Sequence, residues 1–336
     1  MGAIKGVGHG AVKTIVEGRK EDGHYKSIFD LAKRIDLRAA NKKAFEGLAN
    51  AGGFDCWPDT HRAQYFSHDG DGITFLEKAV KYGAKHQENE NSAQISMFGA
   101  ASDVQIAEPI VPPCEDWGTM EKLSREKEVV GIYISGHPLD DFKIEMKTFC
   151  NGNIALFNDL NSVLNREVTF GGVVTDVQHR VSKQGKGWAL FTIEDYTDSF
   201  EFRIFGEDYL KFRHFFVVNS FVYVRAFIKE GWINRDTGKK GDPRIQFNSF
   251  QLLHDVMDTY AKKLSIQLNI DDLGEGKITK LYDLLQLHEG TNTLNFLVYD
   301  NKEKIKVHMP SRKQKVKISQ ELLHELKEQD VRYKLN

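Results

Sequence analysis

The hydrophobic period of this chain changes near Arg166. Before that point apolar residues recur at the spacing of an amphipathic helix, as at Ile28, Leu31 and Ile35. After it they alternate with polar residues, as over 168–177. A chain of 336 residues has room for about two to four domains. The change of period therefore predicts a helical part followed by a part built on β-strands.

The second part is predicted to hold two domains. Strands are expected over 168–177, 188–194, 200–205, 220–229 and 245–253, with a short helix over 209–216 between the third strand and the fourth. This is the order of elements in an OB-fold β-barrel, so we predict an OB-fold domain over 166–256. Residues 257–336 predict a small α+β C-terminal domain, with helices over 277–287 and 320–327.

The helical part also divides in two. Residues 1–68 hold two helical units in tandem, each led by a connector with basic residues, and have eleven lysines and arginines against eight acids. Residues 69–165 are predicted to be a helical extension and linker. In it a first helix ends near residue 86, a polar segment runs from 86 to 108, and a second helix covers 120–132. The predicted fold class is multidomain α+β.

Composition limits the class of protein. The formal net charge is −2, so any nucleic acid must be held by local patches rather than by a globally basic surface. Cys56, Cys114 and Cys150 are far apart, which argues against a disulfide framework or a zinc cluster and favours a reducing, cytoplasmic location. We see no long apolar run and no leader sequence, so neither membrane insertion nor secretion is expected.

The first twenty residues carry the clearest binding signal, a glycine turn that runs directly into an amphipathic helix. Glycines leave the amides accessible, and the first amides of a helix have no intrahelical partner and lie at the positive end of its dipole. This arrangement predicts a cradle for a backbone phosphate that does not depend on base sequence. The residues expected to bind the duplex backbone are Lys5, Gly6, Val7, Gly8, Gly10, Lys13, Arg38, Lys42 and Lys43.

Two other interpretations of the glycine turn stay open. A dinucleotide-binding loop fits poorly, because no strand precedes the turn and the third glycine, Gly10, follows too closely. An ordinary glycine turn between helices is the plainer alternative, and this segment by itself does not decide between that turn and a phosphate cradle.

A short apolar pair interrupts the polar linker. Met97 and Phe98 follow Gln94 at a spacing suited to a docking peptide, whose apolar side chains enter a pocket while the amide fixes the register. The candidate peptide comprises Gln94, Ile95, Ser96, Met97 and Phe98. Folding of the apolar pair back onto the helical part is the alternative.

Alternation along the second and third strands predicts which side chains leave the barrel core. Trp188, Leu190, Thr192 and Arg203 are expected outside, where OB-folds bind single strands by stacking and by phosphate contacts. The alternative for Trp188 is packing on a neighbouring domain. The candidate single-stranded DNA-binding residues are Arg180, Lys183, Lys186, Trp188, Arg203, Trp232, Arg235, Lys239 and Lys240.

No catalytic motif stands out in the sequence. Gly-x-Ser-x-Gly, His-Glu-x-x-His and P-loop patterns are all missing. The acidic pairs Asp140-Asp141 and Asp271-Asp272 fit helix starts or solvent-facing loops. We therefore expect no catalytic residue, no metal-binding residue and no cofactor in this chain.

Four strings, Gly2–Gly8, Ser27–Leu31, Ala51–Asp55 and Gly131–Leu139, together with the order of domains, closely resemble the C-terminal part of the bacterial DNA polymerase III alpha subunit family. The resemblance implies a tandem helix-hairpin-helix module that holds duplex DNA. It also implies that Gln94–Phe98 is a sliding-clamp motif, with Met97 in place of the commoner leucine. In some members the terminal region contacts the clamp loader, and a clamp-loader subunit is therefore an implied partner of residues 257–336.

The same resemblance implies what this chain does not do alone. In the family, a phosphoesterase-like domain and a palm with three metal-binding aspartates and Mg²⁺ come first, and no segment of this sequence corresponds to them. We expect a non-catalytic fragment whose first hairpin is incomplete. Two rival functions are a replisome assembly module with little DNA binding of its own, and a fragment of a DNA ligase or repair nuclease that combines hairpins with an OB-fold.

Overall fold

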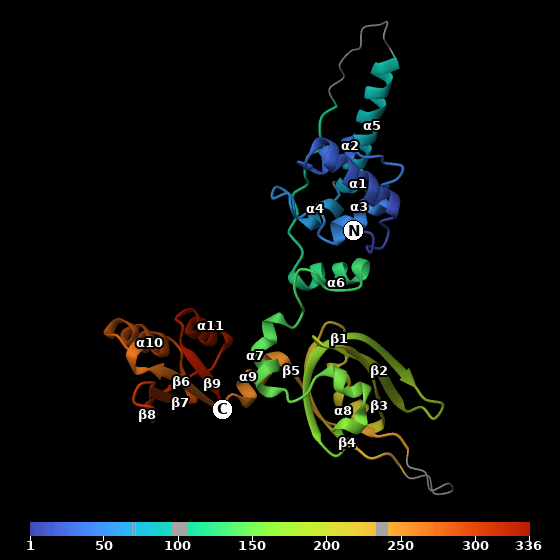
Figure 1. The fold of residues 1–336 in the computed structure, drawn as a ribbon. Coiled ribbons are helices and arrows are strands. Elements are labelled where there is room, and N and C mark those ends of the chain that lie inside the picture. The colour runs from blue at the N-terminus through green and yellow to red at the C-terminus, as the bar shows by residue number, and fades with distance from the viewer. Residues whose placement is uncertain (69, 71, 96–105, 233–240) are drawn as a thin grey trace. The chain divides into compact units, whose positions relative to one another are not determined.

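The computed structural model describes residues 1–68, 70, 72–95, 106–232 and 241–336, with the side chains of 91–95 left out. The chain forms two compact units, Met1–Pro138 and Leu139–Asn336 (Figure 1). The first unit is helical. The second unit contains two β-sheets and the short helices around them.

The helical unit is built around one apolar core, to which Phe29, Phe45, Leu48 and Leu76 contribute. Its second and third helices begin at side-chain caps: Ser27 accepts a hydrogen bond from the Asp30 amide, and Asn41 accepts one from the Ala44 amide. Apart from the end of α5, the predicted helices are confirmed to within a few residues. The elements are α1 (His9–Asp22), α2 (Ile28–Arg34), α3 (Lys42–Asn50), α4 (Arg62–Phe66), α5 (Phe75–Ile95) and α6 (Thr119–Val130).

Helix α5 differs from the prediction. We placed its end near residue 86 because the apolar period stops there, but the helix continues to Ile95. The added turns are rich in Glu and Gln and need no apolar face, since these good helix formers extend a helix that the core has already nucleated. Gln87 fastens this part to the unit by donating to the carbonyls of Ala32, Lys33 and Ile35 at 3.0, 3.0 and 2.8 Å.

The second unit starts earlier than the predicted OB-fold boundary at 165/166. Ile154 and Phe157 are buried in the same core as the strands, which draws the residues after Pro138 into this unit. The sequence did not predict these short elements. They are η1 (Asp140–Phe142), α7 (Lys143–Phe149), η2 (Ile154–Asn158) and η3 (Leu160–Val163).

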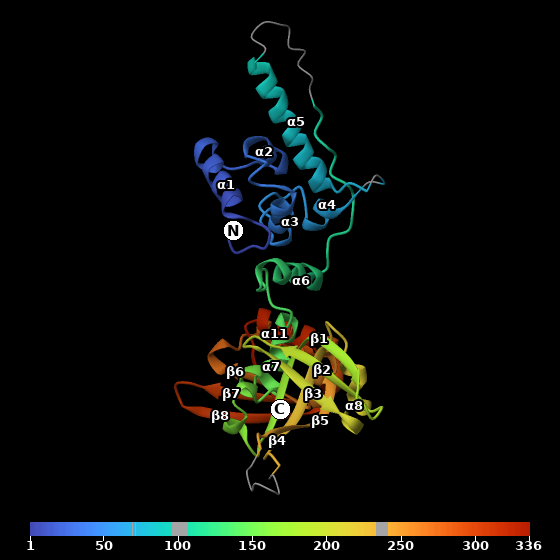
Figure 2. The same cartoon turned by 90° about the vertical axis from the view of Figure 1, so that its right-hand side faces the viewer.

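The first sheet has the predicted OB-fold strand order, but it does not close into the predicted barrel. Its order is β3-β2-β1-β4-β5, and every neighbouring pair is antiparallel. Over the described residues no ladder joins β3 to β5, so the sheet is not a closed barrel. The sheet still curls (Figures 1 and 2), and the rings of Phe202 and Phe247 from its two edge strands lie 5.8 Å apart. The elements are β1 (Glu167–Val181), β2 (Gly187–Glu194), β3 (Ser199–Phe205), α8 (Gly206–Phe212), η4 (Arg213–Phe215), β4 (Phe221–Lys229) and β5 (Arg244–Leu252).

The second sheet confirms the predicted α+β C-terminal domain. Its order is β8-β7-β6-β9, and β6 and β7 are parallel while the outer pairs are antiparallel. Helices α10 and α11 cover one face of it (Figure 1), with Leu281, Leu285 and Leu322 packed on Ile266 and Leu294. The elements are α9 (Leu253–Tyr260), β6 (Lys263–Asn269), η5 (Ile270–Asp272), α10 (Glu275–Leu287), β7 (Glu289–Asp300), β8 (Ile305–Val316), α11 (Gln320–Glu328) and β9 (Arg332–Leu335).

Candidate nucleic-acid interface

The glycine turn before α1 is seated on α3. Gly6 has a φ of +89°, and a Cβ at this position would lie 3.1 Å from Lys43 Cγ and 3.2 Å from the Lys43 carbonyl oxygen. On α3 itself, a Cβ at Gly47 would lie 2.7 Å from the Lys5 carbonyl oxygen. The Lys5 amide donates to the Val129 carbonyl at 2.7 Å, which fastens the turn from another side. The connector that precedes α1 is therefore held against α3.

The start of α1 is open to an outside acceptor. Its N-cap, Gly8, is extended, and within the described residues no side chain caps the helix. The first intrahelical bond is donated by Val12 to the Gly8 carbonyl at 3.2 Å, which leaves the amides of the first turn without helical partners. Because that turn has no acidic residue, the positive end of the helix dipole is not compensated there. At α3, by contrast, Asn41 already occupies one of these amides.

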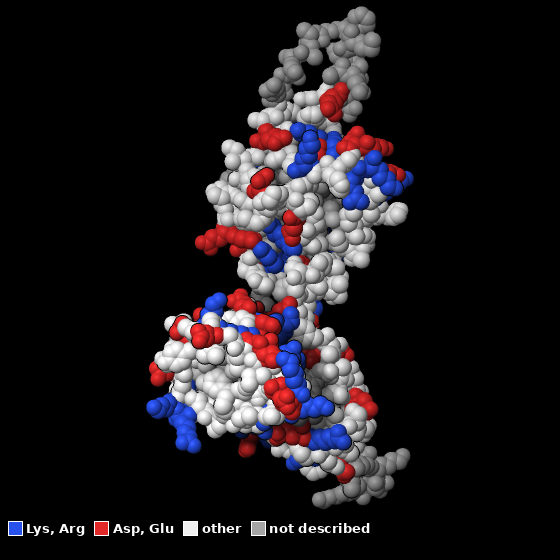
Figure 3. Space-filling view, turned by 60° about the vertical axis from the view of Figure 1, so that its left-hand side comes forward, with Lys and Arg blue, Asp and Glu red and all other residues white. Residues whose placement is uncertain are grey.

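The predicted cations are not equivalent. Lys5, Arg38 and Lys43 are exposed beside the two connectors. Lys42 lies 3.0 Å from Glu77 and 3.8 Å from Glu46, and its hydrogen bond to Glu77 raises its pKa. Figure 3 shows one face on which Lys and Arg side chains of the helical unit lie among Asp and Glu side chains. The three exposed cations are therefore better placed for a phosphate than Lys42.

Three further predicted residues take different places. The Val7 side chain is 4% exposed and belongs to the core, and its amide donates to the Ile4 carbonyl, so Val7 shapes the turn without presenting a side chain to a ligand. The Lys13 ammonium lies 3.9 Å from the Glu17 carboxylate, an exposed pair that competes weakly with any phosphate. Gly10 is exposed, and a Cβ there would lie 3.7 Å from that of Ala39 in the other connector.

The helical unit also holds a partly buried ionic cluster that sequence spacing did not reveal. Arg62 donates to Asp55 at 2.9 and 2.5 Å and to Glu126 at 2.5 Å. Glu126 is fully buried and also accepts from the Ile134 and Ser135 amides at 2.8 and 2.9 Å. Burial alone would raise the pKa of Glu126, but the hydrogen bonds from Ser135, Arg62 and Ile134 prevail and lower it. Its members come from α4, α6 and two loops, too far apart in sequence to form a motif.

The outer surface of β1, β2 and β3 carries a second cluster. Strand register places Arg180, Trp188 and Phe205 in one row. The rings of Trp188 and Phe205 are stacked 5.2 Å apart at 21°, and the Arg180 guanidinium lies 5.5 Å from the centre of the Trp188 ring. Phe205 is 57% exposed and was not among the predicted residues. The sequence could have indicated Phe205, because this residue continues the outward alternation that starts at Arg203.

The next row combines Gln178, Leu190 and Arg203. Arg203 is exposed as predicted, with its guanidinium 3.6 Å from the Glu201 carboxylate. Leu190 was expected to face solvent, but only 9% of it is exposed, so its outward position is covered. The outer surface therefore has a stacked aromatic pair, with Arg180 in the same row and Arg203 in the next row.

The loops beside this surface hold the remaining candidates. Lys183 and Lys186 are exposed in the turn between β1 and β2. Trp232 is 74% exposed, with the Arg244 guanidinium 3.9 Å from its ring centre. Arg235, Lys239 and Lys240 lie outside the described residues.

The docking peptide is almost entirely outside the described part of the chain. Gln94 and Ile95 form the end of α5, and Ser96, Met97 and Phe98 lie beyond the described residues. Where the structure describes side chains, no group of three or more His, Cys, Asp or Glu is placed to hold a metal ion. Within the same residues, no helix has the length and apolar character to cross a membrane.

Comparison with known proteins agrees with the order of domains. Residues 1–65 match a helix-hairpin-helix motif, 168–253 match an OB-fold nucleic acid binding domain, and 264–336 match the C-terminal domain of the DNA polymerase III alpha subunit. Residues 86–108 and the docking peptide fall in none of these matches.

Several curated relatives are DNA polymerase III alpha subunits. The chain is 26% identical to that of Escherichia coli over 289 residues, 86% of this chain and 24% of the relative. It is 26% identical to the Pseudomonas fluorescens protein over 86% of this chain and 25% of the relative. It is 27% identical to the Pasteurella multocida protein over 89% of this chain and 24% of the relative. The chain thus spans about a quarter of the length of these relatives.

Proposed function

We propose that this chain, which belongs with the C-terminal region of the bacterial DNA polymerase III alpha subunit, grips the backbone of duplex DNA with the two connectors before α1 and α3. Its hairpin, OB-fold and C-terminal domains give it a DNA-binding role in replication. The observation that carries the proposal is the uncapped start of α1, which is held against Lys43 by Gly6. Amides and lysines at a helix start bind phosphate without reading bases.

Duplex affinity tests the grip directly. Replacing Arg38 and Lys43 by Ala removes two phosphate contacts, so the log–log salt slope of duplex binding becomes shallower by about 1.8 and affinity falls roughly tenfold. The matched control replaces Lys20 and Lys26, two exposed lysines away from the start of α1, and leaves affinity and slope nearly unchanged. Equal losses in both double variants would show diffuse attraction instead of a grip at the connectors.

Single-stranded DNA is the proposed ligand of the outer surface of β1, β2 and β3. The Trp188–Phe205 stack offers an aromatic face, with Arg180 in the same row and Arg203 in the next row. Stacking of a base on such a face contributes about 1–3 kcal/mol and does not depend on base identity. Loss of single-strand affinity in Trp188→Ala, with duplex affinity retained, is the expected result; unchanged affinity would assign this surface to another partner.

Two further parts of the proposal concern the sliding clamp and chemistry. Gln94–Phe98 tethers the chain to the clamp, and tethering increases processivity because rebinding becomes intramolecular. The Met97→Ala, Phe98→Ala double variant should lose clamp binding in a biosensor assay while DNA binding persists; unchanged clamp affinity would reject the motif. We also propose that the chain contributes binding and no nucleotidyl transfer, so primer extension by the purified chain would contradict this part.

A replisome assembly module is the second candidate function. The acidic neighbours of Lys42 and Lys13 favour it, since they weaken the positive potential around the connectors. Under this function the Arg38, Lys43 double variant and its Lys20, Lys26 control would have the same affinity for duplex DNA.

A further inference from the structure

Among the residues that the structure describes, no helix covers one face of the four-stranded sheet. Helices α10 and α11 pack on the face that carries Leu264, Ile266 and Leu294. Alternate residues of the strands point to the opposite side. We call this second side the open face. It consists of Lys263, Ser265, Gln267 and Asn269 on β6, Thr293, Asn295, Leu297 and Tyr299 on β7, Lys306, His308, Pro310 and Lys315 on β8, and Arg332 and Lys334 on β9.

The open face carries charge of one sign. In this part of the chain, which is described throughout, its paired positions hold five fixed cations and no Asp or Glu. All five are exposed. They lie mainly on the two outer strands: Lys306 and Lys315 on β8, Arg332 and Lys334 on β9, and Lys263 on β6.

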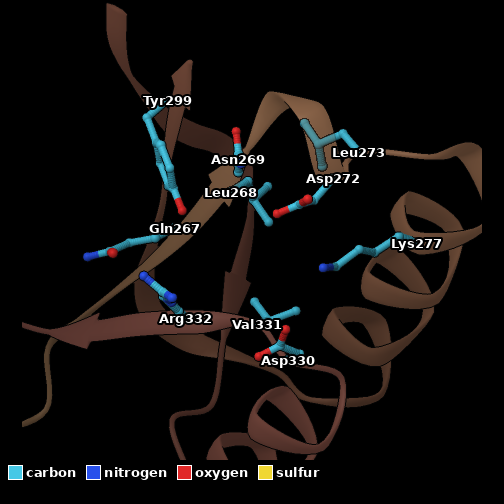
Figure 4. Close-up of a pocket in the computed structure, with 10 residues that line it drawn as sticks. All are labelled: Gln267, Leu268, Asn269, Asp272, Leu273, Lys277, Tyr299, Asp330, Val331 and Arg332. Carbon is cyan, nitrogen blue, oxygen red and sulfur yellow. The ribbon is translucent and has the colours of Figure 1, made fainter. Parts of the chain in front are cut away.

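The centre of the open face is polar and aromatic. Tyr299 and Leu297 are half-buried on β7, and His308 is exposed next to Leu297 on β8. In Figure 4 the side chains of Tyr299, Gln267 and Arg332 come from three neighbouring strands and lie on one side, away from Lys277 on α10. Aromatic rings can stack on bases and amides can form hydrogen bonds with them, so the centre of this face suits bases while the cations suit phosphates.

We propose that the open face binds a single-stranded nucleic acid. Charge complementarity requires a polyanion, and strands about 4.8 Å apart separate the cations of β8 and β9 by roughly 14 Å. A flexible single strand can place its phosphates on either row and its bases on Tyr299, His308 and the central amides, as sheet-based modules do. A duplex keeps its bases stacked inside and cannot use the centre of this face. The proposal uses a different surface from the helical unit and from the outer surface of β1, β2 and β3, and does not depend on them.

Charge neutralisation in the full-length chain tests the proposal. Replacing Lys306 and Lys334 by Ala should weaken binding of a labelled single-stranded oligonucleotide roughly five- to tenfold and make the log–log salt slope shallower by about 1.4, at about 0.7 per phosphate contact. The matched control replaces Lys280 and Lys20, which are exposed on α10 and α1, and should change neither quantity. Equal losses in the two double variants would overturn the proposal.

Two further measurements sharpen the test. The first asks whether the open face binds independently of the outer surface of β1, β2 and β3, and the second asks whether its ligand is a nucleic acid or an acidic peptide. The loss caused by Lys306→Ala and Lys334→Ala should persist in a chain that also carries Trp188→Ala, because the two surfaces are separate; a loss that disappears there would overturn independent binding.

Ultraviolet crosslinking to the oligonucleotide should label the peptides that contain Tyr299 or His308. Absence of those crosslinks, or polyglutamate binding as tightly as the oligonucleotide, would assign the open face to an acidic protein segment instead.

Discussion

The two sheets of the second unit solve the same packing problem in different ways. The five-stranded sheet curls until its edge strands meet through side chains, so that its inner face becomes a phenylalanine-rich core around Phe191, Phe202 and Phe247. The four-stranded sheet stays open and buries one face under α10 and α11. Each sheet therefore has one face outside its own core: the outer surface of the curled sheet, and the open face of the four-stranded sheet.

The difference shows how the position of a residue decides its role. Phenylalanine on the inside of the curled sheet is structural, whereas Phe205, on the outside of the same sheet, is 57% exposed. On the four-stranded sheet Tyr299 is half-buried, because none of the described elements forms a second layer over it. The burial of an aromatic side chain thus indicates whether it stabilises the fold or presents a binding surface.

The largest expected effect contrasts core and surface aromatics. Phe202→Ala leaves a cavity in the curled sheet and should cost about 3–5 kcal/mol of unfolding free energy. Phe205→Ala removes a largely exposed ring and should cost less than about 1 kcal/mol. Chemical denaturation of the second unit, followed by near-ultraviolet circular dichroism, measures both. Similar costs for the two variants would mean that the curl is not held by its core.

A pH effect of intermediate size is expected where α7 meets α11. Glu145 is 1% exposed and accepts from the Gln320 amide at 2.9 Å. Burial raises its pKa, and the hydrogen bond from Gln320 offsets this only in part. A raised pKa means that its stabilising contribution is complete below the ordinary glutamate pKa and is lost as pH rises through the folded value. Glu145→Gln should therefore raise the melting temperature at pH 7, and the gain should vanish toward pH 4.

Glu126 in the helical unit should give stability the opposite dependence on pH. Its pKa is lowered, so its contribution is present at neutral pH and is lost as pH falls through the folded value. Glu126→Gln should lower the melting temperature at pH 7 and matter less in acid. Melting curves of the two variants between pH 4 and pH 7 should therefore diverge from wild type in opposite directions. A common direction would show that burial, rather than hydrogen bonding, controls both carboxylates.

The smallest effect concerns the outer surface of the curled sheet. Arg203 lies 3.6 Å from Glu201, and both are exposed. Glu201→Ala frees the guanidinium and should raise single-strand affinity roughly twofold, while Arg203→Ala should lower it by a similar factor, since an exposed pair is weak. Fluorescence anisotropy at low salt resolves this difference. No change in either variant would remove Arg203 from the binding surface.

The sequence predicted the regular elements well and the surfaces unevenly. Alternation located the five strands of the curled sheet and the outward positions of Trp188 and Arg203, because alternation is a property of each strand alone. The open face could not be predicted in this way, since Lys315 pairs with Thr293 only after a bulge and β9 joins β6 from the far end of the domain. The short helices α7 and α9 have too few residues to show a period.

The helical unit shows the same limit. Local residues predicted the glycine turn and its helix, but the contact of Gly6 with Lys43 and the ionic cluster around Arg62 depend on packing between distant segments. Helix α5 continued past its predicted end because its polar turns carry no apolar period.

Hydrogen–deuterium exchange of the full-length chain with and without a short DNA duplex tests the central claim most directly. The account predicts that duplex DNA slows exchange at the first-turn amides of α1, His9, Gly10 and Ala11, and at Lys42 and Lys43. This protection should not depend on the duplex sequence and should be lost in the Arg38→Ala, Lys43→Ala variant. Protection confined to other parts of the chain, with these amides unchanged, would contradict the account.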